Sequence, residues 1–315
     1  MNAPIKIGTR GSQLALWQAG WVKSFLEKKF PPIRVELVII KTQGDKILDV
    51  PLAKVGGKGL FVKEIEQALL ARKIDLAVHS MKDMPADIPE GLCIGAVPER
   101  ENPLDVFISR DGVGFNELAG GSVIGTSSLR RNAQLRCARP EMVIQPIRGN
   151  LDTRLKKLES EDFDALVLAA AGVKRLNFEH KITEYLDPGI MLPAIGQGAL
   201  CIEIRKNDST VAPLVSALDH APTRTALAGE RAFLKRLEGG CQVPIAGHGQ
   251  IGKNRLTLTG LVAEVDGSRV IKGVKSGPLD SAATIGIELA EDLLAKGADK
   301  ILEKLKSIPL EGFES

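Results

Sequence analysis

The chain is poor in aromatic residues, cysteine and histidine. Aromatic residues make up only 4% of its 315 positions, which argues against the stacking platforms that bind single-stranded nucleic acid. The cysteines Cys93, Cys137, Cys201 and Cys241 lie far apart and form no CxxC pair, and only four histidines are scattered among them. This pattern argues against a structural zinc site, and it predicts free thiols in a reducing compartment.

Membrane spans, secretory signals and nucleotide-binding loops are also missing. The longest apolar run, 165–173, is far shorter than the roughly 20 residues that cross a bilayer. The N-terminus lacks a basic region followed by an apolar one. The glycines at 56–59 do not have P-loop spacing, and the small residues between Lys54 and Lys58 favour a mobile flap. We therefore expect a cytoplasmic protein that binds no membrane and no nucleic acid.

What the sequence does contain is an alternation of strand and helix patterns. The β-branched run 34–41 predicts a strand, and 60–72 places apolar residues on one face of a helix. The segment 75–79 is a short buried strand, and Ser12 can cap an early helix. This alternation predicts a mostly parallel sheet covered by helices.

The same order of segments occurs twice. The residues Ile7–Thr9 recur as Ile124–Thr126. Later, the strand-like segment 75–80 follows a helical segment, and the similar segment 164–169 also follows a helical segment. The shared order predicts two similar α/β domains.

Turn-rich segments at 95–103 and 188–193 fit two crossings between these domains, after which a strand at 198–205 returns to the first. Beyond residue 221, a helix at 225–237, a strand at 243–251, a hairpin turned by Asp266-Gly267 and a helix at 280–295 predict a small α+β domain. We therefore assign residues 1–98 and 199–217 to domain 1, 104–192 to domain 2 and 222–315 to domain 3.

Cations gather without acids in the second domain. Between Glu117 and Glu141 there is no acid, although several arginines lie there, and Arg148 and Arg154 follow. A solvated charged face is the simplest explanation. Arg130 and Arg131, however, stand where a helix begins, so their charge opposes the helix dipole. A bound polyanion carrying carboxylates or phosphates would explain them.

Two other places carry reactive side chains. Ser80, Lys82 and Asp83 follow a strand of the first domain, where open α/β sheets bind ligands, although a surface ion pair would give the same pattern. Cys241 follows two glycines and precedes a proline. Most lone cysteines are small buried hydrophobes, but this context favours an accessible nucleophilic thiol.

Together these motifs resemble the porphobilinogen deaminases, which are hydroxymethylbilane synthases. The matching segments follow in family order from residue 5 into the third domain, and the remainder matches only in general pattern. They are 7–12 with 14–15, 79–85, 125–131 with 133–134, 148–154, 169–176, 193–198 and 239–244.

The resemblance implies two α/β domains like those of periplasmic binding proteins, with the active cleft between them, and a third α+β domain that presents a cysteine. It implies a transferase that joins four porphobilinogen molecules head to tail into hydroxymethylbilane, with release of ammonia, in tetrapyrrole and haem biosynthesis. Cys241 then anchors a dipyrromethane cofactor through a thioether, and Asp83 is the catalytic carboxylate.

The resemblance also assigns binding residues in a monomer that needs no metal. Each pyrrole brings two carboxylates, so a growing chain is a polyanion that a basic cleft can hold. The implied cofactor contacts are Ser80, Lys82, Asp83, Thr126, Ser128, Arg130, Arg131 and Arg148. The implied substrate contacts are Arg10, Ser12, Arg148, Arg154, Arg175 and Gln197, and the flap contains Lys54, Lys58 and Phe61.

Two other functions fit parts of the pattern. A solute receptor of the same two-domain architecture would carry a signal peptide and would not need an accessible cysteine. A phosphate- or nucleic-acid-binding protein would use the arginines, would bind polyphosphates with a steep salt dependence, and would tolerate the loss of Asp83.

Overall fold

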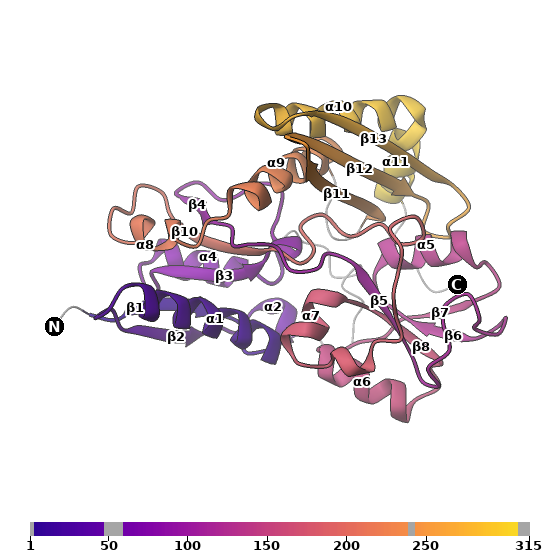
Figure 1. Cartoon of the computed structure of the whole chain (residues 1–315), viewed down its shortest axis with the longest axis horizontal. Coiled ribbons are helices and arrows are strands. Elements are labelled where there is room, and N and C mark those ends of the chain that lie inside the picture. The colour runs from indigo at the N-terminus through magenta and orange to yellow at the C-terminus, as the bar shows by residue number, and fades with distance from the viewer. Residues whose placement is uncertain (1–2, 47–58, 239–242, 308–315) are drawn as a thin grey trace.

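The computed structural model describes residues 3–46, 59–238 and 243–307. Cys241 and the flap residues Lys54 and Lys58 lie outside these ranges. Two five-stranded sheets, each covered by helices, lie side by side, and a three-stranded sheet with its own helices packs above them (Figure 1). Within the described ranges, no helix has both the length and the apolar character needed to cross a bilayer.

The first sheet has the strand order β2-β1-β3-β10-β4. Its inner strand β1 runs parallel to β2 and β3, whereas β10 runs antiparallel to both β3 and β4. Helix α1 (Gln13–Lys29) covers one face and α4 (Lys63–Leu70) the other. As predicted, Ser12 caps α1, its Oγ accepting from the Ala15 N–H at 3.3 Å. The strands are β1 (Ile5–Thr9), β2 (Val35–Ile39), β3 (Leu76–Ser80), β4 (Leu92–Ala96) and β10 (Leu200–Arg205).

The second sheet repeats this arrangement in the order β7-β6-β8-β5-β9. Here β6 is parallel to β7 and β8, and β5 is the antiparallel strand between β8 and β9. The two similar α/β domains expected from the sequence are therefore confirmed, and β10 brings the chain back into the first sheet. The strands are β5 (Asp105–Ser109), β6 (Val123–Gly125), β7 (Val143–Gln145), β8 (Ala165–Ala169) and β9 (Glu184–Tyr185), and the helices are α5 (Leu129–Ala138), α6 (Leu151–Ser160) and α7 (Ala170–Arg175).

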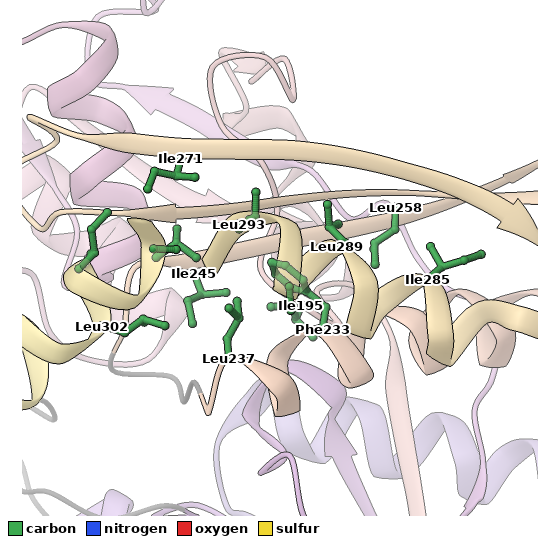
Figure 2. Packing of buried hydrophobic residues seen from close by; sticks show 14 of the residues in the cluster. Ile195, Phe233, Leu237, Ile245, Leu258, Ile271, Ile285, Leu289, Leu293 and Leu302 are labelled. Carbon is green, nitrogen blue, oxygen red and sulfur yellow. The ribbon is translucent and has the colours of Figure 1, made fainter. Parts of the chain in front are cut away.

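The third sheet is an antiparallel meander, β11-β12-β13, with α9 and α10 packed on one face. Its apolar core includes Phe233, Leu258 and Leu289 (Figure 2). Helix α11 continues this layer beyond the predicted end of the last helix. The elements are α9 (Ala221–Arg236), β11 (Ile245–Gly252), β12 (Arg255–Ala263), β13 (Val270–Pro278), α10 (Ala282–Leu293) and α11 (Asp299–Ser307).

The turn between β12 and β13 docks the third sheet onto α5. The predicted Asp-Gly hairpin is present, and Gly267 has a φ of +73°. A Cβ atom at this position would lie 2.6 Å from the Ala133 carbonyl oxygen and 2.7 Å from the Cys137 nitrogen. Asn132 Nδ2 also donates to the Val265 carbonyl at 3.0 Å. The turn therefore needs glycine both for its backbone conformation and for its approach to α5.

Two buried glutamates and a histidine lie close together in the first domain. Glu66 on α4 and Glu203 on β10 are both buried, and His79 Nε2 lies 3.1 Å from Glu203 Oε2. In the described part of the chain, one oxygen of each glutamate has no hydrogen-bond partner. Burial, and after it the charge of Glu203, raises the pKa of Glu66 to about 7, although His79 opposes this shift.

Glu66 should make the stability of the protein depend on pH. The pKa of Glu66 is higher in the folded state than the ordinary value of 4.5. Its contribution to the free energy of unfolding is therefore full below pH 4.5 and is lost as the pH rises through about 7. We expect the free energy of unfolding to fall by on the order of 2–3 kcal/mol between pH values of about 5 and about 8 from this group. Urea unfolding at both pH values measures it.

Glu66→Gln imitates the protonated acid and should remove most of this pH dependence. Glu36→Gln, which changes an exposed glutamate on β2, serves as the control and should keep it. If Glu66→Gln kept the full wild-type dependence, the assignment of this titration to Glu66 would be wrong.

Candidate active site

A cavity of about 1490 Å³ lies between the two α/β domains. The first domain contributes the ends of β1 and β3, and the second contributes the N-terminal parts of α5 and α6. The third domain closes part of the wall with Glu264, Val265, Asp266 and Lys304. Among the described lining residues, nine side chains are cationic and five are acidic. The cavity is therefore suited to a polyanionic ligand.

The cavity gathers most of the residues predicted from the sequence. Of those that the structure describes, only Arg130 and Gln197 are not among its lining residues. Gln197 is fully buried, and its Nε2 donates to the Pro103 carbonyl at 2.7 Å, which joins the segment before β10 to the first crossing between the domains. The predicted residues that line the cavity are Arg10, Ser12, Phe61, Ser80, Lys82, Asp83, Thr126, Ser128, Arg131, Arg148, Arg154 and Arg175.

Asp83 stands at the end of β3, in the short 3-10 turn Met81–Asp83. Its side chain is half-buried, and within the described ranges no hydrogen-bond partner lies near its carboxylate. Burial lowers the pKa of the adjacent Lys82 to about 8; Arg131 and Arg130 add to this effect, and Asp83 and Asp105 oppose it. The turn therefore presents a carboxylate to the cavity next to an ammonium group that can lose its proton near neutral pH.

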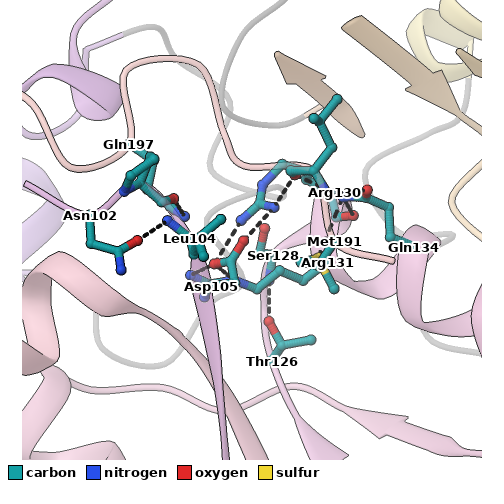
Figure 3. A network of polar contacts seen from close by, with 12 residues as sticks. Asn102, Leu104, Asp105, Thr126, Ser128, Arg130, Arg131, Gln134, Met191 and Gln197 are labelled. Carbon is teal, nitrogen blue, oxygen red and sulfur yellow. Dashed lines mark hydrogen bonds and ion pairs between the residues drawn. The ribbon is translucent and has the colours of Figure 1, made fainter. Parts of the chain in front are cut away.

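Arg130 and Arg131 share one buried carboxylate, that of Asp105 (Figure 3). Arg130 Nη1 donates to Oδ2 at 2.8 Å, and Arg131 Nε and Nη2 donate to Oδ1 at 2.9 and 2.7 Å. Burial would raise the pKa of Asp105, but the two guanidinium groups hold it down at about 2. The two arginines in the first turn of α5 are therefore already paired with an acid of the protein, Asp105.

Asp105 was not among the residues predicted from the sequence. Its only local signal was an acidic residue at the start of the apolar segment Asp105–Ser109, which the structure shows to be strand β5. The acid opposes α5 only because the second sheet brings β5 beside β8, a contact that local patterns do not reveal.

Arg148 and Arg154 differ in their hydrogen bonds to the rest of the protein. Arg148 has no hydrogen-bond partner in the described part of the chain. Arg154 Nε donates to the Gly149 carbonyl at 2.9 Å, and burial, together with the charges of Arg131 and Arg148, lowers its pKa to about 10. Repulsion among these cations is relieved when an anion binds between them.

Two further arginines make contacts within or across the first domain. Arg10 pairs with Asp45 and lies 4.1 Å from the centre of the Phe61 ring. Arg175, on α7 of the second domain, donates to the Gly198 carbonyl at 2.8 Å and lies over Trp17 of α1. Burial lowers its pKa to about 10. Arg175 therefore touches the other wall of the cavity as well as lining it.

Two family models together cover most of the chain. The model described as "Porphobilinogen deaminase, dipyromethane cofactor binding domain" matches residues 5–213, and "Porphobilinogen deaminase, C-terminal domain" matches residues 224–295. The porphobilinogen deaminase of Geobacter metallireducens is 57% identical over 301 residues, which are 96% of this chain and 94% of that protein. That of Carboxydothermus hydrogenoformans is 54% identical over 306 residues, 97% of this chain and 98% of its own length.

A solved structure with a partial likeness is a probable amino-acid ABC transporter extracellular-binding protein from Bacillus subtilis. It is 14% identical, with a TM-score of 0.42, and the match covers 69% of this chain and 90% of that one.

Proposed function

This chain belongs to the porphobilinogen deaminase family, and we propose which of its residues carry out the family's reaction. The enzyme joins four porphobilinogen molecules head to tail, with loss of ammonia, into hydroxymethylbilane, a step of tetrapyrrole biosynthesis. We assign catalysis to Asp83 and attachment of the dipyrromethane cofactor, through a thioether, to Cys241.

The observation that supports this proposal is the excess of positive charge in the cavity around Asp83. Cations outnumber acids on the cavity walls. Of the five acids on these walls, Asp83 and Asp152 have no hydrogen-bond partner among the described residues, and Asp83 is the one that follows a strand end. Each pyrrole of the substrate carries an acetate and a propionate, so every added unit brings two more anions. Guanidinium groups bind such carboxylates through paired, charge-assisted hydrogen bonds.

The side chains present fit a dipyrromethane with its four carboxylates. Arg131, Arg148 and Arg154 offer guanidinium donors, and the hydroxyl groups of Thr126 and Ser128 lie on the same wall. Cys241 lies in the connection between α9 and β11, outside the described residues. When bound, the group supplies the free pyrrole carbon to which the first substrate is joined. The protein's part is to hold its carboxylates.

We assign the substrate carboxylates to Arg10, Arg148, Arg154 and Arg175, with Ser12 as a further contact. Arg130 and Gln197, which do not line the cavity, support this wall through their neighbours. We further propose that the protein is a cytoplasmic monomer that needs no metal. The three described cysteines, Cys93, Cys137 and Cys201, are free thiols.

Intact mass spectrometry tests the covalent attachment. The purified protein should be heavier than its sequence by two pyrrole units, and Cys241→Ser should lose this excess because serine cannot form the thioether. Cys137→Ser is the matched control, since it removes an exposed thiol of α5, and it should keep the full excess. An active wild-type protein of unmodified mass would contradict the proposal, and so would an adduct that survives in Cys241→Ser.

A further inference from the structure

The shared carboxylate of Asp105 leaves one guanidinium group only partly engaged. Asp105 Oδ1 accepts from Arg131 Nε and Nη2, and within the described ranges Arg131 Nη1 has no hydrogen-bond partner. Arg131 lines the cavity, whereas Arg130 does not. One acid between two arginines also leaves one positive charge in excess. The cluster therefore offers the unengaged N–H groups of one fixed guanidinium and a single net positive charge to a ligand at this wall.

Asp105 also occupies a particular place in the chain. It is the first residue of β5, directly after the first crossing between the domains. Arg130, held by Asp105 at 2.8 Å, donates from the same Nη1 to the Leu192 carbonyl at 2.7 Å, in the second crossing. Both arginines start from the first turn of α5. The position of the Arg131 guanidinium is therefore tied to both crossings as well as to its own helix.

We propose that Asp105 is a positioning residue that fixes Arg131 so that its free edge meets a carboxylate of the cofactor while the holoenzyme forms. The proposal rests on the proposed function. Asp105 itself is fully buried and does not line the cavity, so it acts through Arg131. Without its charge, two neighbouring guanidinium groups would repel each other, and the side chain of Arg131 would lose the two bonds that orient it.

The charge of Asp105 reaches Lys82 as well. Among the described residues, the charged groups that act on this ammonium are Asp83 on its own turn, Arg130 and Arg131 on α5, and Asp105 on β5. Asp105 is one of the two acids that hold the pKa of Lys82 up at about 8. Removal of this negative charge should therefore lower that pKa, whereas a substitution that keeps the charge and disturbs only the packing should leave it unchanged.

The test follows holoenzyme formation from porphobilinogen by intact mass at a series of pH values. In Asp105→Asn we expect the rate constant of adduct formation to fall by roughly 10-fold or more, and the decline on the alkaline side to move to lower pH. In Asp105→Glu the charge remains but is displaced by one methylene group. This variant should also form the adduct more slowly, with the alkaline decline in its wild-type place.

Asp164→Asn is the matched control. Asp164 is a half-buried acid of the same domain whose Oδ2 accepts from the Val123 N–H at 2.7 Å, and it does not line the cavity. It should reduce thermal stability without changing the rate or pH profile of adduct formation. Wild-type rates in Asp105→Asn would overturn the proposal; if that variant fails to fold, wild-type rates in folded Asp105→Glu would do so. A wild-type protein that gains no adduct would instead overturn the proposed function.

Discussion

Asp83→Asn should abolish nearly all turnover while leaving porphobilinogen able to bind. The substitution keeps the size and hydrogen-bonding capacity of the side chain and removes its charge. The loss should reach at least the 10²–10³-fold, roughly, that follows removal of one group stabilising charge in a transition state. Asp83→Glu should keep a trace of activity, because its charge survives in a slightly displaced position.

We expect this loss because the reaction needs a negative charge near the pyrrole ring and does not need a proton from Asp83. The leaving amine of porphobilinogen is an alkylamine, which like lysine has a pKa of about 10 and is already protonated at neutral pH. Ammonia can therefore leave without a proton from Asp83. Positive charge then develops on the substrate's pyrrole ring, and a carboxylate that accepts the pyrrole N–H stabilises it. The same carboxylate can take up the proton that is lost after the next ring attacks.

Single-step elongation rates over a range of pH distinguish this role from that of a general acid. An essential carboxylate predicts activity that rises with pH through its titration, and an essential carboxylic acid predicts the opposite. Asp152→Asn, which changes another acid of the cavity wall on α6, is the control and should stay within several-fold of wild type. A near-normal rate for Asp83→Asn would remove Asp83 from the mechanism.

Glu230→Gln should lower the free energy of unfolding by about 3–5 kcal/mol. Glu230 is fully buried in α9, and its Oε1 accepts from Arg100 Nη1 at 2.5 Å and from the Gly249 N–H at 2.8 Å. Its Oε2 accepts from the Gly196 N–H at 2.7 Å. These bonds join the third domain to the first crossing, through Arg100, and to the segment between the second crossing and β10, through Gly196. Without the carboxylate, the guanidinium of Arg100 is left with no counter-charge in a site largely removed from water.

Urea unfolding measures this loss, and two further variants interpret it. Glu291→Gln breaks an exposed ion pair with Arg236 and should cost less than about 1 kcal/mol. The double variant Arg100→Met with Glu230→Gln removes both charges and should recover part of the stability, because no buried charge is then left alone. If Glu230→Gln were as stable as Glu291→Gln, the buried pair would contribute nothing beyond a surface contact.

Local patterns in the sequence were enough to predict the two repeated α/β units, the cap at Ser12 and the return strand β10. The strand and helix patterns and the cap depend on residues close together in the chain, and the return of β10 followed from the two turn-rich crossings. The last helix, α11, was missed because Gly297, with a φ of +99°, looks like the end of α10. In the structure it forms a kink between two helices that share one core.

For the site, the sequence also predicted which residues line the cavity but not which residues they contact. Asp83 and most of the arginines line the cavity as expected, because strand ends and helix starts in such sheets face the ligand. The partners of these residues were not predictable. Asp105 opposes Arg131 only through the strand order of the second sheet, and Asp266 enters the wall only through the docking of its turn on α5. Such contacts depend on how distant segments pack.

The interleaved strands have a consequence for how the protein is made. All strands of the second sheet lie within residues 105–185, so that sheet can close as soon as this stretch has left the ribosome. The first sheet cannot, because β10 lies between β3 and β4 and is synthesised after the whole second sheet. Until then β3 and β4 expose unpaired backbone edges, which invite association with other chains. The unit that is translated first is therefore the one that completes its fold later.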